Sequence, residues 1–254
     1  MTDLHSHILY GVDDGSTDID MSLEMLEIEA ESGTKNVVLT PHCNIPDGYA
    51  NYINPVIIRR YENLKRKAKE KNININVFLG MEVYASEDII ELIDVGAIIP
   101  INKSRYMLVE FSFTEDPMWV SHILGKIQST GLVPLLAHPE RYEFVQEFPP
   151  MVYDWIKSGC AIQVNRGSIV GKFGERPKNT VHYLLQHNLV HVVASDGHRP
   201  YVRQPILNDA YEKVEEYYGT IKANLLFKEN PARVLSDHRV IRIRQSDIDT
   251  SSQR

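Results

Sequence analysis

The stretch Asp3-Leu4-His5-Ser6-His7 places two histidines two residues apart near the start of the chain, with the apolar residues Leu4 and Ile8 on either side. In a β-strand, residues i and i+2 point to the same face, so the two imidazoles can reach one point. Imidazole nitrogen is a good ligand for zinc, manganese and other divalent metals. An isolated pair of this kind is more often an ordinary polar N-terminus. This pair is the first member of a pattern that recurs along the chain.

Short apolar runs alternate with helical patterns throughout the sequence. The predicted strands are the stretch around His5 and His7, then 37–40, 75–79, 106–109, 133–137, 161–164 and 190–194. The predicted helices are 18–32, 57–71, 87–96, 116–130, 149–158, 178–188, 205–218 and 231–236. Alternation without a compositional break predicts an α/β fold with a parallel sheet. Seven β/α units favour a closed or distorted barrel over an open sheet, although periodicity alone does not decide between them. We expect one domain over residues 1–244 and a disordered polar tail over 245–254.

Residues of the types that commonly bind metals follow six of the seven predicted strands. They are His5, His7, His42, Glu82, Glu110, His138, Asp196 and His198, and Asp14 joins them from the first loop. The sixth strand ends in Asn165 instead. Active sites of such barrels lie at the C-terminal ends of the strands, so we expect these side chains to converge.

Taken singly, each of these residues also fits a turn or a solvated loop, and only the recurrence favours a metal cluster. Nine such groups suffice for two or three ions, because waters fill some coordination positions. Imidazole mixed with carboxylate, without thiolate, indicates manganese, iron or zinc and not a structural cysteine-zinc site.

Composition restricts the class of protein. The chain has 254 residues, of which 43% are hydrophobic and 24% charged, as in ordinary globular proteins with a substantial core. No apolar run approaches the roughly 20 residues that span a bilayer, and no signal peptide is recognisable, so we expect no membrane insertion. Two cysteines fit a reducing cytoplasm. A formal charge of −7 disfavours nucleic-acid binding through a basic surface.

Six segments carry a resemblance to a known family. They are Asp3-Leu4-His5-Ser6-His7, Asp13-Asp14-Gly15, Thr40-Pro41-His42, Gly80-Met81-Glu82, His138-Pro139-Glu140-Arg141 and Ser195-Asp196-Gly197-His198. Together they resemble the polymerase and histidinol phosphatase (PHP) superfamily. Their order and spacing are similar to the bacterial manganese-dependent protein tyrosine phosphatases of the CpsB/CapC/YwqE type, and the segment from Gly167 to Gly174 also matches that branch. The resemblance covers about residues 1–240.

The resemblance implies a distorted (β/α)7 TIM-like barrel, the PHP fold, with a trinuclear manganese site. By position, His5, His7 and Asp196 would hold one ion, Glu82 would bridge to a second that Glu110 and His138 complete, and Asp14, His42 and His198 would serve the third. The implied reaction is phosphotyrosine hydrolysis in the cytoplasm. The implied partner is a bacterial tyrosine kinase that controls capsule or exopolysaccharide synthesis.

Two arginines are the candidate catalytic residues. A hydroxide that bridges two ions is the expected nucleophile, because coordination lowers the pKa of water toward neutrality. The phosphoryl oxygens then need fixed positive charge, which arginine supplies through two parallel donors. Arg141 follows His138 by three residues and Arg203 follows His198 by five, and both match arginines of the resembling family.

Three other interpretations remain open. Cys160 and Arg166 have the C-x5-R spacing of cysteine-based tyrosine phosphatases, but the residues between them contain no glycine and alternate like a strand. A loop that cradles phosphate usually needs glycine, which disfavours this interpretation. A small-molecule phosphatase of the same superfamily, such as a histidinol-phosphate phosphatase, is the alternative enzyme. A metal-binding regulatory module without turnover is the alternative outside enzymes.

Overall fold

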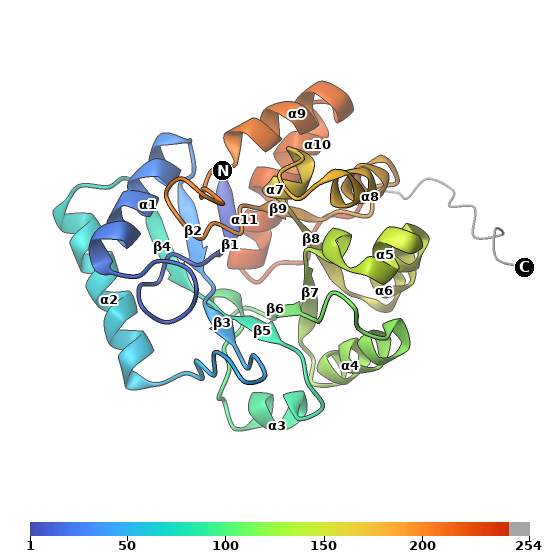
Figure 1. Ribbon diagram of the computed structural model, residues 1–254, viewed down its shortest axis with the longest axis horizontal. Helices are drawn as coiled ribbons and strands as arrows, with labels where there is room; N and C mark the ends of the chain where they lie inside the picture. The colour runs from blue at the N-terminus through green and yellow to red at the C-terminus, as the bar shows by residue number, and fades with distance from the viewer. Residues whose placement is uncertain (244–254) are drawn as a thin grey trace, which may run out of the picture.

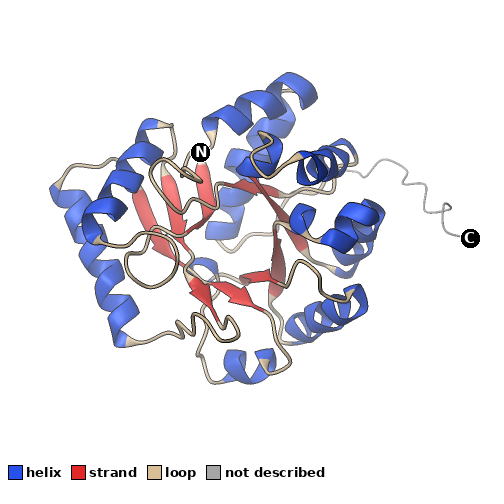
Figure 2. Ribbon diagram, in the orientation of Figure 1, coloured by secondary structure: helices blue, strands red, loops and turns tan. Residues whose placement is uncertain are grey.

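A computed structural model gives the structure of residues 1–243, in which parallel strands form a ring and helices cover its outside (Figure 1, Figure 2). The strands are β1 (Thr2–Ser6), β2 (Asn36–Leu39), β3 (His42–Cys43), β4 (Asn76–Leu79), β5 (Glu82–Tyr84), β6 (Tyr106–Glu110), β7 (Val133–Ala137), β8 (Ala161–Asn165) and β9 (Val192–Ala194). The helices are α1 (Ile19–Glu31), α2 (Pro55–Glu70), α3 (Ile89–Asp94), α4 (Pro117–Ser129), α5 (Glu143–Glu147), α6 (Val152–Ser158), α7 (Arg166–Ile169), α8 (Glu175–Gln186), α9 (Asn208–Tyr218), α10 (Thr220–Asn224) and α11 (Asn230–Leu235).

The strands follow one another around the ring in chain order. One sheet has the order β1-β2-β4 and the other β3-β5-β6-β7-β8-β9, and every pair is parallel. The chain runs directly from β2 into β3 and from β4 into β5, so these four short strands make two passes of the barrel. The ring closes where Ser6 bridges Gly197 and the His7 N–H donates to the Gly197 carbonyl at 2.8 Å. The predicted α/β barrel with seven passes is confirmed.

Most predicted elements are confirmed with shifted ends, and a few predictions were wrong. The segment from Gly167 to Gly174 lies outside every predicted helix, but its first residues belong to α7. The helix expected from residue 149 begins as a 3₁₀ turn over Pro149–Met151, because two successive prolines lack the N–H groups that an α-helix uses. The short helix α10 and the π-helical turn Leu225–Glu229 were not predicted, since Gly219 (φ 86°) interrupts the helical pattern.

Two apolar layers fill the barrel and surround it. The inner layer contains Leu4, Val38, Leu108, Leu135, Ala137, Ala161 and Val192, and Ile101, Tyr106 and Val234 belong to the same cluster. The outer layer packs the strands against the helices. Along β6, Tyr106 and Leu108 belong to the inner cluster while Met107 and Val109 belong to the outer one. Because side chains alternate along a strand, Glu110 comes back to the inner side at the strand's C-terminal end.

A register shift in β1 places two neighbouring residues inside the barrel. The pairing of β1 with β2 shifts between Asp3 and Ser6. Leu4 packs in the inner layer, and the next residue, His5, also turns inward, with its Nδ1 3.0 Å from Gln163 Oε1 of β8. Strict alternation would send these two side chains to opposite faces, and an irregularity of this kind re-aims a side chain. The shift therefore brings His5 into the barrel above Leu4.

None of the helices within residues 1–243 is both long and apolar enough to cross a membrane. The expected disordered tail, 245–254, lies outside the described residues. The single domain over 1–244 stays a prediction.

Replacing Tyr106 with phenylalanine should destabilise the barrel. The buried Tyr106 hydroxyl donates to the His238 carbonyl at 3.0 Å and accepts the Val240 N–H at 2.9 Å, which fastens the C-terminal segment to the inner layer. We expect Tyr106→Phe to lower the free energy of unfolding by about 1–3 kcal/mol in urea denaturation, because both backbone groups lose their partner. The exposed Tyr217 is the matched control, and Tyr217→Phe should change stability by less than about 0.5 kcal/mol. Equal stability of the two variants would contradict this role of Tyr106.

Candidate metal centre

The predicted ligands meet at the C-terminal ends of the strands. His5, His42, Glu82 and Glu110 belong to β1, β3, β5 and β6, His138 directly follows β7, Asp196 and His198 follow β9, and His7 and Asp14 follow β1. Seven of the nine are buried, His42 is half-buried and Asp14 is exposed. The structure therefore brings together residues that are up to 193 positions apart in the sequence, from His5 to His198.

These side chains form four overlapping groups whose ligand atoms lie within 4.8 Å of one another. The groups are His5, His7 and Asp196; His5, Glu82 and His138; His42, Glu82 and Glu110; and His7, Asp14, His42 and His198. The first and last contain the sets expected for the first and third ions. Glu110 and His138, which were expected to share an ion, fall into different groups that have Glu82 in common. Glu82 thus has the shared position that a bridging carboxylate needs.

Two carboxylates occupy the middle of the cluster. Glu82 Oε2 lies 3.1 Å from His5 Nε2, 3.2 Å from His7 Nε2 and 3.1 Å from His42 Nδ1. Its other oxygen is 2.9 Å from His138 Nε2. Asp196 Oδ1 lies 3.5 Å from His5 Nε2 and 3.4 Å from His7 Nε2. Each carboxylate therefore faces several imidazole nitrogens.

The nitrogen and oxygen atoms of the cluster are better placed to bind divalent cations than to form hydrogen bonds with one another. Within residues 1–243, His42 Nδ1, Glu82 Oε2, Glu110 Oε1 and His198 Nε2 are buried without a hydrogen bond of acceptable geometry. Buried polar atoms in folded proteins nearly always have such a bond. Two atoms that are each about 2.1 Å from a shared tetrahedral cation lie roughly 3.4 Å apart. The separations around Glu82 and Asp196 are close to that value, so the residues present can hold divalent metal ions.

Two further polar residues orient the histidine rings. Asp13 Oδ2 lies 2.8 Å from His7 Nδ1 and accepts the His42 N–H at 3.0 Å. Gln163 Oε1 lies 3.0 Å from His5 Nδ1. Such partners fix the ring so that its other nitrogen faces the metal. Sequence reasoning assigned neither residue a role. Asp13 could have been noticed beside Asp14, whereas nothing in the sequence distinguishes Gln163.

Strand β8 supplies none of the predicted ligands, but its last residue, Asn165, holds one of them in position. The Asn165 side chain donates to Asp196 Oδ2 at 2.6 Å, and its N–H donates to Glu140 Oε1 at 2.9 Å. Glu140 is buried and also accepts the Ser168 hydroxyl at 2.6 Å. Asn165 and Glu140 thereby fix the position of Asp196. This explains why the sixth strand ends in an amide.

The cluster is electrostatically coupled. Burial alone would lower the pKa of His7, but Asp13 beside it raises that pKa well above its usual range. Burial disfavours the charged form of His42, whereas the nearby Glu82 favours it. The net effect raises the pKa of His42 to about 10. His198 differs, because burial and the neighbouring His7 lower its pKa to about 4. Burial would raise the pKa of Glu82, but His5 and His42 hold it well below its usual range. Glu82 is therefore ionised, and protons compete with a cation for His7 and His42.

Both predicted arginines lie at the edge of the cluster. Arg141 Nη1 is 3.4 Å from Asp196 Oδ2, and Arg203 bonds the same oxygen. The Arg141 guanidinium carbon lies 4.5 Å from the ring centre of Phe113 and 4.6 Å from that of Phe173, so two aromatic rings flank it. Neither phenylalanine was singled out from the sequence, although Phe173 belongs to the segment between Gly167 and Gly174.

The structure contradicts the cysteine mechanism. The residues between Cys160 and Arg166 form strand β8 and not a phosphate-binding loop. Cys160 is buried before the first residue of that strand, at the opposite end from the cluster, and burial raises the pKa of its thiol to about 11. Arg166 Nε donates to Asp209 at 2.9 Å. This pair is therefore structural.

Comparisons with known proteins agree with the geometry. A family described as capsular polysaccharide synthesis, CpsB/CapC, matches residues 1–236. The tyrosine-protein phosphatase CpsB of Streptococcus pneumoniae is 32% identical over 242 residues, which are 93% of this chain and 99% of that protein. The tyrosine-protein phosphatase YwqE of Bacillus subtilis is 30% identical over 244 residues, 95% of this chain and 94% of YwqE.

Solved structures give the same result. A crystal structure from a study of YwqE and CpsB, described as unique metal-dependent tyrosine phosphatases, matches with a TM-score of 0.90 and 28% identity, covering 98% of this chain and 100% of the other. A lactonase from Listeria monocytogenes has a TM-score of 0.58 at 13% identity, covering 94% of this chain and 95% of the other, and shares the fold.

Metal affinity should rise with pH. His5, His7 and His42 have raised pKa values, and a protonated imidazole cannot bind a cation, so binding must release protons. We expect the Mn²⁺ association constant to increase by up to about tenfold per pH unit for each proton displaced, between about pH 6 and 8. Calorimetric titration in buffers of different ionisation heat measures the protons released. His42→Ala should release about one proton fewer, and pH-independent binding without proton release would contradict the expectation.

Proposed function

This chain belongs to the CpsB/CapC family of capsular polysaccharide synthesis proteins, and we propose that it is a metal-dependent phosphatase that hydrolyses phosphotyrosine in a protein substrate. One observation carries the proposal. Nine imidazole and carboxylate groups, Glu82 and Asp196 among them, lie together in one cluster, and two arginines border it. That arrangement provides both a binding site for divalent cations and hydrogen-bond donors for a phosphoryl group. The names of the relatives CpsB and YwqE support phosphotyrosine as the substrate.

The proposed cofactor is Mn²⁺, bound as two or three ions. The proposed ligands are His5, His7, Asp14, His42, Glu82, Glu110, His138, Asp196 and His198. Imidazole and carboxylate together favour manganese, and iron and zinc are the competing metals. When bound, these cations would supply a hydroxide nucleophile at neutral pH and stabilise negative charge on the phosphoryl oxygens.

Arg141 and Arg203 are the proposed phosphate-binding residues. Their side chains are 20% and 28% exposed, so both are accessible to a ligand arriving from solvent. A guanidinium group donates two parallel hydrogen bonds to a phosphate, which fixes its orientation as well as its charge. The leaving group needs little protonation, because a phenolate has a pKa near 10. Positioning and charge are therefore the main tasks of this chain's residues.

Aromatic side chains at the rim favour an aryl phosphate. Tyr49 is 38% exposed, and its ring stacks on His42 with centroids 6.2 Å apart and an interplanar angle of 6°. Phe113 is equally exposed and meets His138 edge-on at 6.1 Å. Both rings are therefore next to proposed metal ligands and present apolar surface to solvent. We infer that they contact the phenyl ring of phosphotyrosine, which offset or edge-on packing would favour.

The proposed protein substrate is a bacterial tyrosine kinase, and the proposed location is the cytoplasm. The family description, capsular polysaccharide synthesis, supports this setting. Both cysteines are free and buried, as is usual in a reducing compartment.

Hydrolysis of a phosphotyrosine peptide with and without chelator tests the proposal. We expect activity to be lost with chelator, to return with Mn²⁺, and to be unchanged in Cys160→Ser, because that thiol is buried away from the centre. Histidinol phosphate should be a poor substrate in the same assay. Chelator-resistant activity that disappears in Cys160→Ser would overturn the metal mechanism. A protein that binds Mn²⁺ but turns over no phosphoester would be the regulatory module instead.

Removing Arg141 should weaken catalysis without releasing metal. We expect Arg141→Ala to lower kcat/KM for the phosphotyrosine peptide by about 100-fold or more. That is the usual effect of losing a hydrogen-bond donor that stabilises negative charge in the transition state. Metal content, measured by elemental analysis, should stay at the wild-type value. Arg176, an exposed arginine on α8, is the control, and Arg176→Ala should leave kcat/KM unchanged. Wild-type kinetics in Arg141→Ala would remove this residue from the mechanism.

A further inference from the structure

A cavity of about 270 Å³ opens beside the phosphate-binding arginines. One wall is the loop after α7, with Lys172 and Phe173, and the other is the loop after β9, with Tyr201, Val202 and Arg203. Arg203 also bonds Asp196, and Phe173 also stacks on Arg141. Because these two wall residues contact Asp196 and Arg141, the cavity adjoins the metal centre.

Glycines give the α7 loop the shape that forms this wall. A Cβ atom on Gly167 would lie 2.6 Å from Phe173 Cε2, so only glycine leaves room for the ring. Gly171 and Gly174 have φ values of 80° and 92°, which side chains rarely adopt. The loop thereby presents Phe173 to the arginines and Lys172 to the cavity.

The cavity is lined by positive and not by negative charge. Arg166, Lys172 and Arg203 line it, and no carboxylate does so among the described residues. Arg166 is paired with Asp209, and Arg203 with Asp196. The Lys172 ammonium group has no ion pair or hydrogen bond within residues 1–243, and the side chain is exposed. Tyr201 and Val202, 76% and 69% exposed, add apolar surface to the opposite wall.

We propose that this cavity binds an acidic side chain next to the phosphotyrosine of the substrate, and that Lys172 determines this specificity. The proposal rests on the proposed function and adds a substrate class to it. The chain carries a formal charge of −7, so its net charge would repel an acidic segment of the substrate. An unpaired lysine in a cavity without carboxylates, adjacent to the phosphate site, provides the local attraction. Tyr201 and Val202 would pack against the methylene groups of the same substrate residue.

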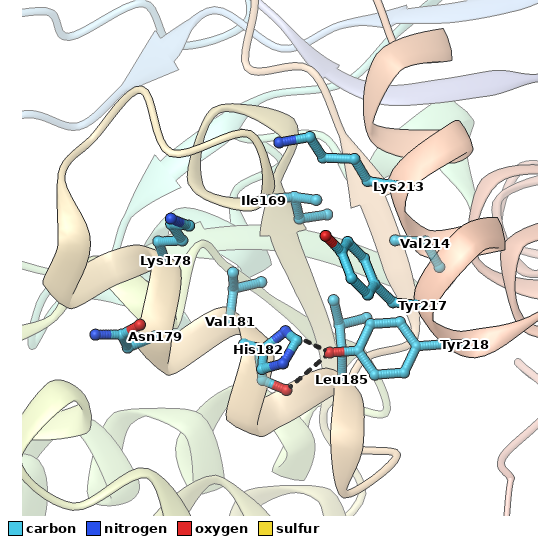
Figure 3. A pocket seen from close by; sticks show the side chains of 10 residues that line it. All are labelled: Ile169, Lys178, Asn179, Val181, His182, Leu185, Lys213, Val214, Tyr217 and Tyr218. Atoms are coloured by element: carbon cyan, nitrogen blue, oxygen red, sulfur yellow. Dashed lines mark hydrogen bonds between the residues drawn. The ribbon is translucent and has the colours of Figure 1, made fainter.

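A second cavity supplies the matched control. It measures about 410 Å³ and lies between α8 and α9, with Lys178 and Lys213 on the two flanking helices (Figure 3). Its lower part is closed by His182, whose Nδ1 lies 2.7 Å from the Tyr218 hydroxyl (Figure 3). It shares only α7 with the first cavity, through Ile169, and no residue of the metal centre lines it. Lys213→Ala therefore removes the same charge as Lys172→Ala from a different place.

The experiment compares two phosphotyrosine peptides that differ only in flanking residues, Asp and Glu in one and Asn and Gln in the other. With Mn²⁺ present, wild type should have about fivefold higher kcat/KM for the acidic peptide, the upper effect of an exposed ion pair. Lys172→Ala should abolish this preference and leave kcat/KM for the neutral peptide unchanged. Lys172→Glu should reverse it, and Lys213→Ala should keep it. The preference should also decrease with added salt.

Binding of the same peptides with a non-hydrolysable phosphonate in place of phosphate separates recognition from turnover, and should show the same ratio. Three results would overturn the proposal: no preference in wild type, a preference that survives in Lys172→Ala, or a preference lost in Lys213→Ala, which would place recognition in the second cavity. Each of these can occur while wild type still hydrolyses the neutral peptide, so failure of the subsite is distinguishable from failure of the proposed function.

Discussion

The structure depends on the burial of two carboxylates, Glu82 and Asp196, at one end of a barrel. Both are almost inaccessible to solvent, and a buried charge is costly unless positive partners and hydrogen bonds surround it. Four imidazoles from three chain segments face Glu82, and Arg141, Arg203 and Asn165 reach Asp196. A metal centre explains the cluster better than ion pairing does, because several of its buried nitrogen and oxygen atoms have no hydrogen bond to any residue that the structure describes.

Barrel closure and the centre support each other. Asp3 Oδ1 accepts the N–H groups of His5 and Ser195, and so holds the first strand to the segment after the last one. The Asp196 N–H donates to the His5 carbonyl at 2.9 Å, next to the bridge between Ser6 and Gly197. The same contacts that close the ring therefore bring His5 and His7 to Asp196.

The fold and the convergence of nine side chains could be predicted from the sequence, because the alternation of strands and helices indicated a parallel sheet and the family resemblance indicated a barrel. Strand ends in a parallel barrel share one edge, so residues such as Glu110 and His138 could be placed without coordinates. The supporting contacts could not be predicted in this way. Gln163 and Asn165 act on His5 and Asp196 across the barrel, and the register shift in β1 breaks the alternation from which inward residues are inferred. Phe173 reaches Arg141 only because Gly167 leaves space for its ring. These are long-range packing relations that have no local signature.

The most direct test of the account is to count and locate the metal ions in the purified protein. Elemental analysis combined with anomalous diffraction from Mn²⁺-loaded crystals measures both quantities. We expect two or three ions per chain, bound within ligand distance of Glu82 and Asp196, and loss of at least one ion in Glu82→Ala. Metal bound elsewhere on the chain, or a fully active protein without ions at these carboxylates, would contradict it.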